Sequence, residues 1–121
     1  MNSPGVAWTN DAAWIEVDHL GTVMAINERF TADFGWTAQA IVGHPLLSLV
    51  PEHFRDAHNL GFARFAQFGK SNILGQPVIL PLLAADGKAM MAETCIQAER
   101  RQGHWRFGAQ CRLAGGQAGE R

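Results

Sequence analysis

The sequence predicts an α+β fold in which a five-stranded antiparallel sheet carries several short helices and one long helix on one face. Residues 14–18 and 22–27 alternate apolar and polar side chains, which is typical of a hairpin of two strands. Residues 51–69 repeat apolar side chains at helical spacing, which predicts a long helix. Residues 76–84 and 90–113 predict three further strands in a meander. Because the helices lie between the second and third strands, we expect them on one face of the sheet.

The first half of the chain contains turn and capping signals between its short elements. Residues 19–21 include a glycine and connect the two strands of the hairpin. Residues 28–34 form a short helix that Gly35 ends. Thr37 caps a second short helix, which Gly43 ends. Several short helices therefore precede the long one.

The long helix contains a histidine within its apolar face. Pro51 suits the first helical position, Glu52 meets the positive end of the helix dipole, and Gly69 is a C-cap. The residues that share the apolar face are Phe54, His58, Phe62 and Phe65. His58 is therefore either a packed core histidine or a residue that faces something held in the core.

The second half changes from helical to strand periodicity. Pro77 and Pro81 indicate an edge strand or a bulge, because proline donates no hydrogen bond to a sheet. Residues 85–87 and residues 102–103 predict two turns. The last strand alternates, and the side chains that share one of its faces are Trp105, Phe107, Ala109, Cys111 and Leu113. The alternation does not decide whether that face is the inner one.

Composition indicates one globular domain in a chain of 121 residues with 47% hydrophobic residues. We expect a lead-in over residues 1–12, a domain over residues 13–113 and a disordered glycine-rich tail over residues 114–121. Ten basic and eleven acidic residues give a net charge of −1 without a basic stripe, which argues against nucleic-acid binding. No apolar run approaches the ~20 residues of a membrane span.

The N-terminus lacks the basic and apolar regions of a signal peptide, so we expect a cytoplasmic protein. Cys95 and Cys111 are then expected as free thiols, and neither has metal-ligand spacing to a histidine. The carboxylates are scattered, and the sequence lacks a nucleophile motif and a glycine-rich phosphate loop. We therefore expect no enzymatic activity.

The order of elements resembles that of PAS domains, the sensory modules of many bacterial kinases, cyclases and chemoreceptors. The resemblance covers about residues 13–113. The features that carry it, in order, are Asn27 after the hairpin, the run FGWTAQAIVGHPLLSLVPEHFRDAHNLGFARF, Gly75, Asp86-Gly87 and Glu93. It implies a sensory domain that holds a small molecule or a gas in its core and passes a signal to an effector domain.

Among PAS domains the pattern is similar to FixL-type heme oxygen sensors. That resemblance places His58 at the proximal heme ligand, and so as a metal ligand, and Arg64 at an arginine that contacts a heme propionate. In those sensors a distal arginine hydrogen-bonds bound oxygen, and its position falls on Val78 here. The distal methionine of a related heme sensor falls on Gln76, and a second histidine that contacts a propionate falls on Asn72. The resemblance thus implies b-type heme held on its proximal side, whereas this chain lacks the distal donor that discriminates oxygen.

Strand alternation predicts which side chains join His58 and Phe62 around the pocket. They are Gln76, Val78, Leu80, Met90, Ala92, Thr94 and Ile96. A flavin (FAD or FMN) or a small metabolite is the alternative ligand, and a ligand-free dimerisation module is a further alternative. The light-sensing flavin subclass needs a cysteine near the start of the long helix, and this chain has none there.

The opposite face of the sheet is predicted to be partly apolar. The residues expected there are Trp14, Glu16, Ile79, Pro81 and Cys95. An exposed apolar patch of this kind usually marks a partner surface. The resemblance to PAS domains implies that the partner is a second copy of the chain, so we expect a homodimer through this outer face.

Overall fold

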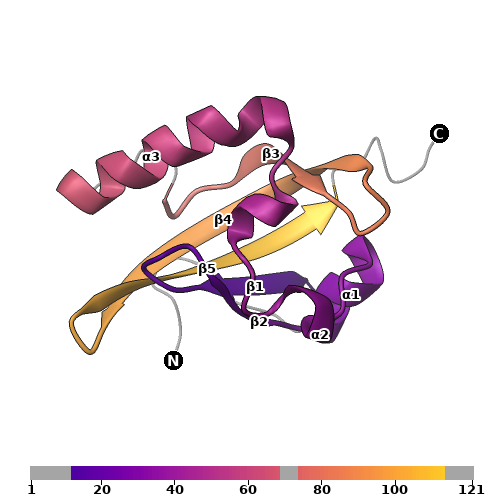
Figure 1. Cartoon of the computed structure of the whole chain (residues 1–121), viewed down its shortest axis with the longest axis horizontal. Helices are drawn as coiled ribbons and strands as arrows, with labels where there is room; N and C mark the ends of the chain where they lie inside the picture. Colours follow the sequence, from indigo (N-terminus) through magenta and orange to yellow (C-terminus); the bar gives the residue numbers. More distant parts are fainter. Residues whose placement is uncertain (1–11, 69–73, 114–121) are drawn as a thin grey trace.

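The computed structural model describes residues 12–68 and 74–113, which form a twisted five-stranded antiparallel sheet with helices beside it (Figure 1). The strand order is β2-β1-β5-β4-β3. The strands are β1 (Ala13–Val17), β2 (Val23–Ile26), β3 (Val78–Leu83), β4 (Ala89–Arg101) and β5 (His104–Leu113). The predicted α+β fold is confirmed. β1 and β5, the first and last strands of the chain, pair in the middle of the sheet. The sheet is therefore held together by residues far apart in sequence.

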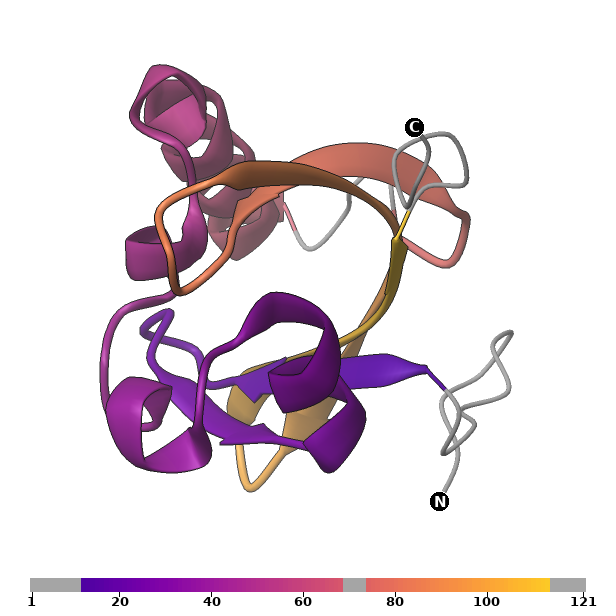
Figure 2. The same ribbon diagram turned by 90° about the vertical axis from the view of Figure 1, so that its right-hand side faces the viewer.

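The helices occupy two separate regions. They are α1 (Glu28–Phe34), α2 (Ala38–Ile41), the 3₁₀ turns η1 (Leu46–Leu49) and η2 (Glu52–Phe54), and α3 (Arg55–Phe68). Figures 1 and 2 show α1 and α2 beside β1 and β2, whereas α3 lies apart from them on the side of β3 and β4. None of the helices within the described ranges is long and apolar enough to cross a membrane.

The best-packed part of the core lies between the sheet and the helices α1 and α2. Phe30 and Phe34 on α1 are almost completely buried, and their rings lie 4.9 Å apart. Ile41 on α2 and Val23 on β2 are buried in the same cluster. Burial of each such side chain contributes about 1.5–3 kcal/mol. This region therefore supplies most of the apolar burial that the described residues show.

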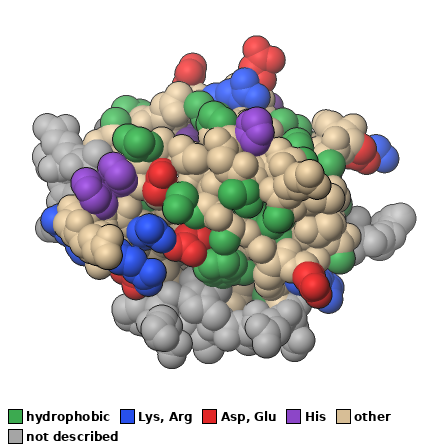
Figure 3. All heavy atoms as spheres, turned by 60° about the horizontal axis from the view of Figure 1, so that its bottom comes forward, with side chains coloured by type: hydrophobic (Ala, Val, Ile, Leu, Met, Phe, Trp, Pro, Cys, Tyr) green, Lys and Arg blue, Asp and Glu red, His purple; other side chains and the backbone are tan. Residues whose placement is uncertain are grey.

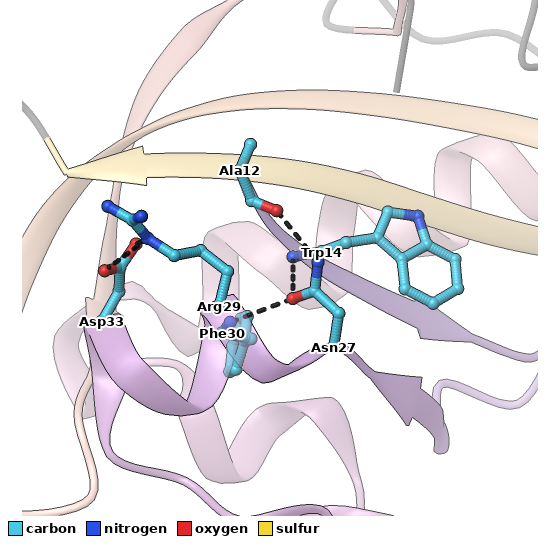
Figure 4. A network of polar contacts seen from close by, with 6 residues as sticks. All are labelled: Ala12, Trp14, Asn27, Arg29, Phe30 and Asp33. Carbon is cyan, nitrogen blue, oxygen red and sulfur yellow. Dashed lines mark hydrogen bonds and ion pairs between the residues drawn. The ribbon is translucent and has the colours of Figure 1, made fainter. Parts of the chain in front are cut away.

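The side chain of Asn27 fastens β1 to the start of α1 (Figure 4). Its Oδ1 accepts hydrogen bonds from the backbone N–H of Phe30 at 2.9 Å and of Trp14 at 3.0 Å. Its Nδ2 donates to the carbonyl of Ala12 at 3.0 Å. One amide thus caps the helix and satisfies two backbone groups at the start of β1.

The long helix begins later than the sequence predicted. Residues 51–69 were expected to form one continuous helix, but Pro51 has ψ 145° and is not helical. The N–H of Phe54 donates to the carbonyl of Pro51 at 2.9 Å, a 3₁₀ bond that makes η2 a separate turn before α3. The predicted C-cap Gly69 lies outside the described residues.

The strand register decides which side chains face inward. Ile15 pairs with Ala109, and Cys111 pairs with Ala13 and is 2% exposed. The alternating set of β5 that begins with Trp105 is therefore on the inner face. Pro81 lies in β3, at the edge of the sheet, as its missing donor predicted.

Candidate ligand pocket beneath α3

Helix α3 meets the sheet through aromatic rings. The ring of Phe65 makes edge contacts with Trp105 at 4.8 Å and with Phe107 at 5.3 Å between centroids. The ring of Phe62 lies 5.5 Å from that of Phe107. Edge-to-face contacts at such distances are favourable but leave space between the ring faces. Helix and strand are thus held together by four rings that do not fill the volume between them.

A pocket of about 220 Å³ lies among these rings. The described residues that line it are His19, Phe62, Phe65, Gly103, His104, Trp105 and Phe107. Its walls are therefore aromatic, and imidazoles and a glycine backbone supply the polar groups. Such a combination of apolar walls and a few polar groups is typical of small-molecule sites.

Two turns of the sheet form one side of the pocket. The pairing of Val17 with Phe107 brings the turn between β1 and β2 next to the turn between β4 and β5. His19 and His104 lie in or beside these turns, with ring centroids 4.2 Å apart and planes inclined by 16°. Both side chains are exposed to solvent. The histidine pair therefore forms a polar rim beside an aromatic interior.

His58 lies next to this cluster and is half-buried. Its ring is stacked on Phe62 with centroids 6.4 Å apart and planes inclined by 9°. Burial lowers the pKa of the His58 imidazole, and a hydrogen bond with Asn59 opposes part of that shift. The Nδ1 atom is buried and has no hydrogen-bond partner among the residues that the structure describes. The lowered pKa favours the neutral form of this imidazole, and one of its nitrogens is unsatisfied in the described structure. His58 is not among the described residues lining the pocket.

The strand residues predicted to line a pocket do share the inner face. Val78 pairs with Thr94, and Leu80 and Ile96 occupy the same face in the register. Val78, Leu80 and Ile96 are half-buried. Thr94 is 7% exposed, and its hydroxyl donates to the carbonyl of Ala92 at 3.0 Å. Thr94 therefore does not need a ligand to satisfy its donor.

Gln76 and Arg64 are the two remaining predicted site residues. Gln76 is exposed in the bend that precedes β3. The backbone of Arg64 belongs to α3, but its side chain lies outside the described part of the structure, so its predicted contact with a propionate stays a prediction. The structure therefore brings His58 and Phe62 together.

The cysteines are free, as the sequence predicted. Burial raises the pKa of the Cys111 thiol to about 12, with the Thr94 hydroxyl opposing and Asp33 reinforcing the shift. Cys95 is half-buried on the outer face. In the described part of the chain, no three His, Cys, Asp or Glu side chains gather as a metal site would require.

The volume of the pocket limits what it holds. An empty cavity of about 150 Å³ binds benzene, and pockets for drug-sized ligands measure about 300–1,000 Å³. A pocket of about 220 Å³ accommodates one aromatic ring with a short substituent. A porphyrin or a three-ring flavin is larger than the volume that the described residues bound.

Sequence reasoning identified only Phe62 among the residues that line this pocket. Phe65 had been placed on the same helix face, but the inner face of β5, and so the position of Trp105, was undecided. No local sequence pattern indicates that His19 and His104 belong to a site, because each lies beside a turn. Only the pairing of β1 with β5 brings the two residues together.

Comparison with known proteins identifies the fold. No protein-family model matches the sequence. An uncharacterised protein of Azorhizobium caulinodans is 31% identical over 102 residues, which is 84% of this chain and 14% of that protein. The chain thus spans about a seventh of the length of this relative.

Solved PAS structures are similar in shape. The PAS domain of a Colwellia psychrerythraea protein has a TM-score of 0.69 and 13% identity, over 84% of this chain and 85% of the other. Cycle PAS-B of Drosophila melanogaster with bound ethylene glycol has a TM-score of 0.67 and 13% identity, over 84% and 99% of the two chains. The Rhodobacter sphaeroides LOV protein has a TM-score of 0.67 and 16% identity, over 86% and 60%.

These likenesses extend over most of the described residues and include the order of strands and helices. The chain therefore has the PAS fold.

Proposed function

We propose that this chain is a sensory PAS domain that binds a small, mainly apolar ligand in the aromatic pocket between α3 and β5. The observation that carries the proposal is the pocket of about 220 Å³ walled by Phe62, Phe65, Trp105 and Phe107. A ligand there would contact α3 and the central strand together. Its binding would stabilise α3 against the sheet, and such a change is one that an effector domain elsewhere in a signalling protein can detect.

The similar structures support a small ligand. Cycle PAS-B carries ethylene glycol in one structure, which shows that a domain of this shape holds a molecule of a few atoms. The LOV protein is the reason for keeping a flavin as the alternative, since LOV domains are the light-sensing flavin subclass. The size of the described pocket favours the smaller ligand over either flavin or heme.

Heme bound through His58 is the second candidate, and a specific observation favours it. The unsatisfied, buried Nδ1 and the lowered pKa describe a neutral imidazole, which is the form that binds iron. Heme would supply an iron that binds gases. Val78, at the position of the arginine that hydrogen-bonds bound oxygen in the similar sensors, has no side-chain donor.

The visible absorption spectrum of the purified protein separates these candidates. We expect no absorption band at wavelengths longer than those at which the protein itself absorbs. A Soret band that disappears in His58→Ala would establish heme, and a pair of bands in the blue would establish a flavin. Either outcome would overturn the proposal of a smaller ligand.

Binding of a single-ring probe tests the proposal directly. Titration with toluene should shift the indole N–H resonance of Trp105 in an NMR spectrum, because that ring forms a wall of the pocket. The indole of Trp36 is an internal control, since its Nε1 donates to the carbonyl of Leu83 at 2.8 Å and it is not among the described residues lining the pocket. The variant Trp105→Phe assigns the resonance. Equal shifts of both indoles, or none, would contradict the pocket as a site.

We also propose that the domain pairs with a second copy through the outer face of the sheet. Ile79 is 59% exposed and Met91 is 40% exposed, and both lie on that face. Ile79→Asp should lower the mass measured by light scattering at micromolar concentration while leaving the fold intact. Leu60→Asp is the matched control, because Leu60 is 58% exposed on α3 instead. A protein that is monomeric at high concentration would contradict this proposal.

A further inference from the structure

The polar rim of the pocket is formed by groups that can donate hydrogen bonds to an anion. His19 and His104 are the histidines among the described residues that line the pocket, and no carboxylate is among those residues. Every histidine ring has at least one N–H that can donate a hydrogen bond. The rim therefore offers donors without an acidic side chain in the described lining.

A permanent positive charge lies next to the same rim. The guanidinium of Arg100 lies 5.3 Å from the centroid of the Trp105 ring, and its Nη2 donates to the carbonyl of Gly103 at 3.3 Å. Trp105 and Gly103 both line the pocket. Figure 3 shows adjacent histidine side chains at one edge of the molecule, with both basic and acidic side chains near them.

The charged side chains on the neighbouring elements are already engaged. Asp18 accepts hydrogen bonds from the backbone N–H groups of Leu20 and Thr22. Two ion pairs lie near the two turns: Arg101 with Glu99, and Arg106 with Glu16 on the outer face. His58 is stacked on Phe62. Asp18 is not among the described residues that line the pocket, and those residues include no carboxylate.

We propose that the ligand of this pocket is a single-ring aromatic acid, with its ring among the aromatic walls and its carboxylate at His19, His104 and Arg100. This inference rests on the proposed function and names its ligand class. The ring fills the volume that remains between Phe62, Phe65, Trp105 and Phe107. The carboxylate takes the solvent-exposed rim, so only the ring has to leave water.

The stacked histidines place two hydrogen-bonding rings side by side, with centroids 4.2 Å apart. The guanidinium of Arg100 lies beside them. An aromatic acid should therefore bind more tightly than a neutral molecule of the same shape.

The test uses three probes of one shape: phenylacetate, its neutral amide phenylacetamide, and the cation 2-phenylethylammonium. The Trp105 indole resonance reports binding of each. We expect phenylacetate to bind about fivefold more tightly than phenylacetamide, and the cation most weakly. Exposed charge pairs of this kind are modest, so the predicted ratio is modest too.

Matched variants locate the effect. His19→Ala combined with His104→Ala should lower the ratio of phenylacetate to phenylacetamide affinity, and Arg100→Gln should lower it as well. His44→Ala is the control, because His44 is exposed in the segment between α2 and η1. Neutral phenylacetamide should bind all of these variants alike, which shows that the pocket remains folded.

The outcomes separate the two proposals. Binding of all three probes with equal affinity would overturn the aromatic-acid inference and leave the pocket as a ligand site. Binding of none of them, with toluene also inactive, would overturn the proposed function. Binding that prefers the cation would contradict the assignment of the rim as a positive site.

Discussion

The two helical regions on the inner face of the sheet are attached to it in different ways. In the first region, α1 packs Phe30 and Phe34 into a filled core, and the Asn27 amide connects the helix to β1 with hydrogen bonds of 2.9–3.0 Å. In the second region, α3 touches β5 through ring edges, and a pocket of about 220 Å³ remains between them. His58 on α3 also has a buried nitrogen without a partner in the described structure.

This difference predicts which region stabilises the fold and which responds to a ligand. Regions with few buried apolar contacts open at lower free energy than filled cores. We therefore expect the region of α1 to contribute most to the stability of the domain and the region of α3 to respond to a ligand. Substitutions in the two regions should differ in the size of their effects.

The largest effect is expected from Phe30→Ala. Phe30 is 0% exposed, and truncation of a buried phenylalanine costs about 3–5 kcal/mol because it leaves a cavity. Leu60→Ala on α3 is the matched control, since Leu60 is 58% exposed and should change stability by less than about 0.5 kcal/mol. Urea unfolding measures both. Similar losses for the two variants would contradict the comparison.

Asn27→Ala should give the next largest loss of stability, about 2–3 kcal/mol. It removes a helix cap, worth about 1 kcal/mol, and leaves the N–H of Trp14 and the carbonyl of Ala12 without this partner. Asn27→Asp keeps the accepting oxygen and loses the donor to Ala12, so its unfolding free energy should fall between those of wild type and Asn27→Ala. An alanine variant as stable as wild type would show that this amide does not hold β1 to α1.

The smallest effect concerns pH and His58. Burial lowers the pKa of His58 in the folded protein, so the unfolded chain binds the proton more readily. Stability should therefore fall as the pH drops below about 6.5, the ordinary value for histidine, and stop falling below the lowered folded pKa. Melting temperatures across this range measure the effect. His58→Gln should reduce the slope, whereas His53→Gln, at an exposed histidine in η2, should not; equal slopes in all three proteins would exclude His58 as the cause.

The contrast also explains what the sequence could predict. The strands, the helix that Gly35 ends and the edge position of Pro81 depend on local chemistry, and these predictions are confirmed. The predicted start of the long helix was wrong. Pro51 is not helical and a separate 3₁₀ turn follows it, and periodicity does not reveal either feature. The helix and strand patterns were enough to predict the fold, because residues that are close together in sequence specify each element.

The pocket was less accessible to sequence reasoning because it depends on contacts between distant residues. His19 and His104 meet only because β1 pairs with β5, and neither turn carries a pattern that indicates a site. Gln76 was expected on the inner face but lies exposed before β3, since the strand begins two residues later. The predicted roles of His58 and Arg64 toward a heme stay predictions.

Hydrogen–deuterium exchange with and without phenylacetate tests the central claim most directly. In the free protein, we expect the amides of α3 to exchange faster than those of α1 and β1, because α3 lies over an unfilled pocket. Saturation with the ligand should slow exchange in α3 and leave α1 and β1 unchanged; a ligand at about 100 times its dissociation constant adds up to about 2.7 kcal/mol to the state that binds it. Exchange in α3 as slow as in α1 before addition, or unchanged by the ligand, would contradict the account.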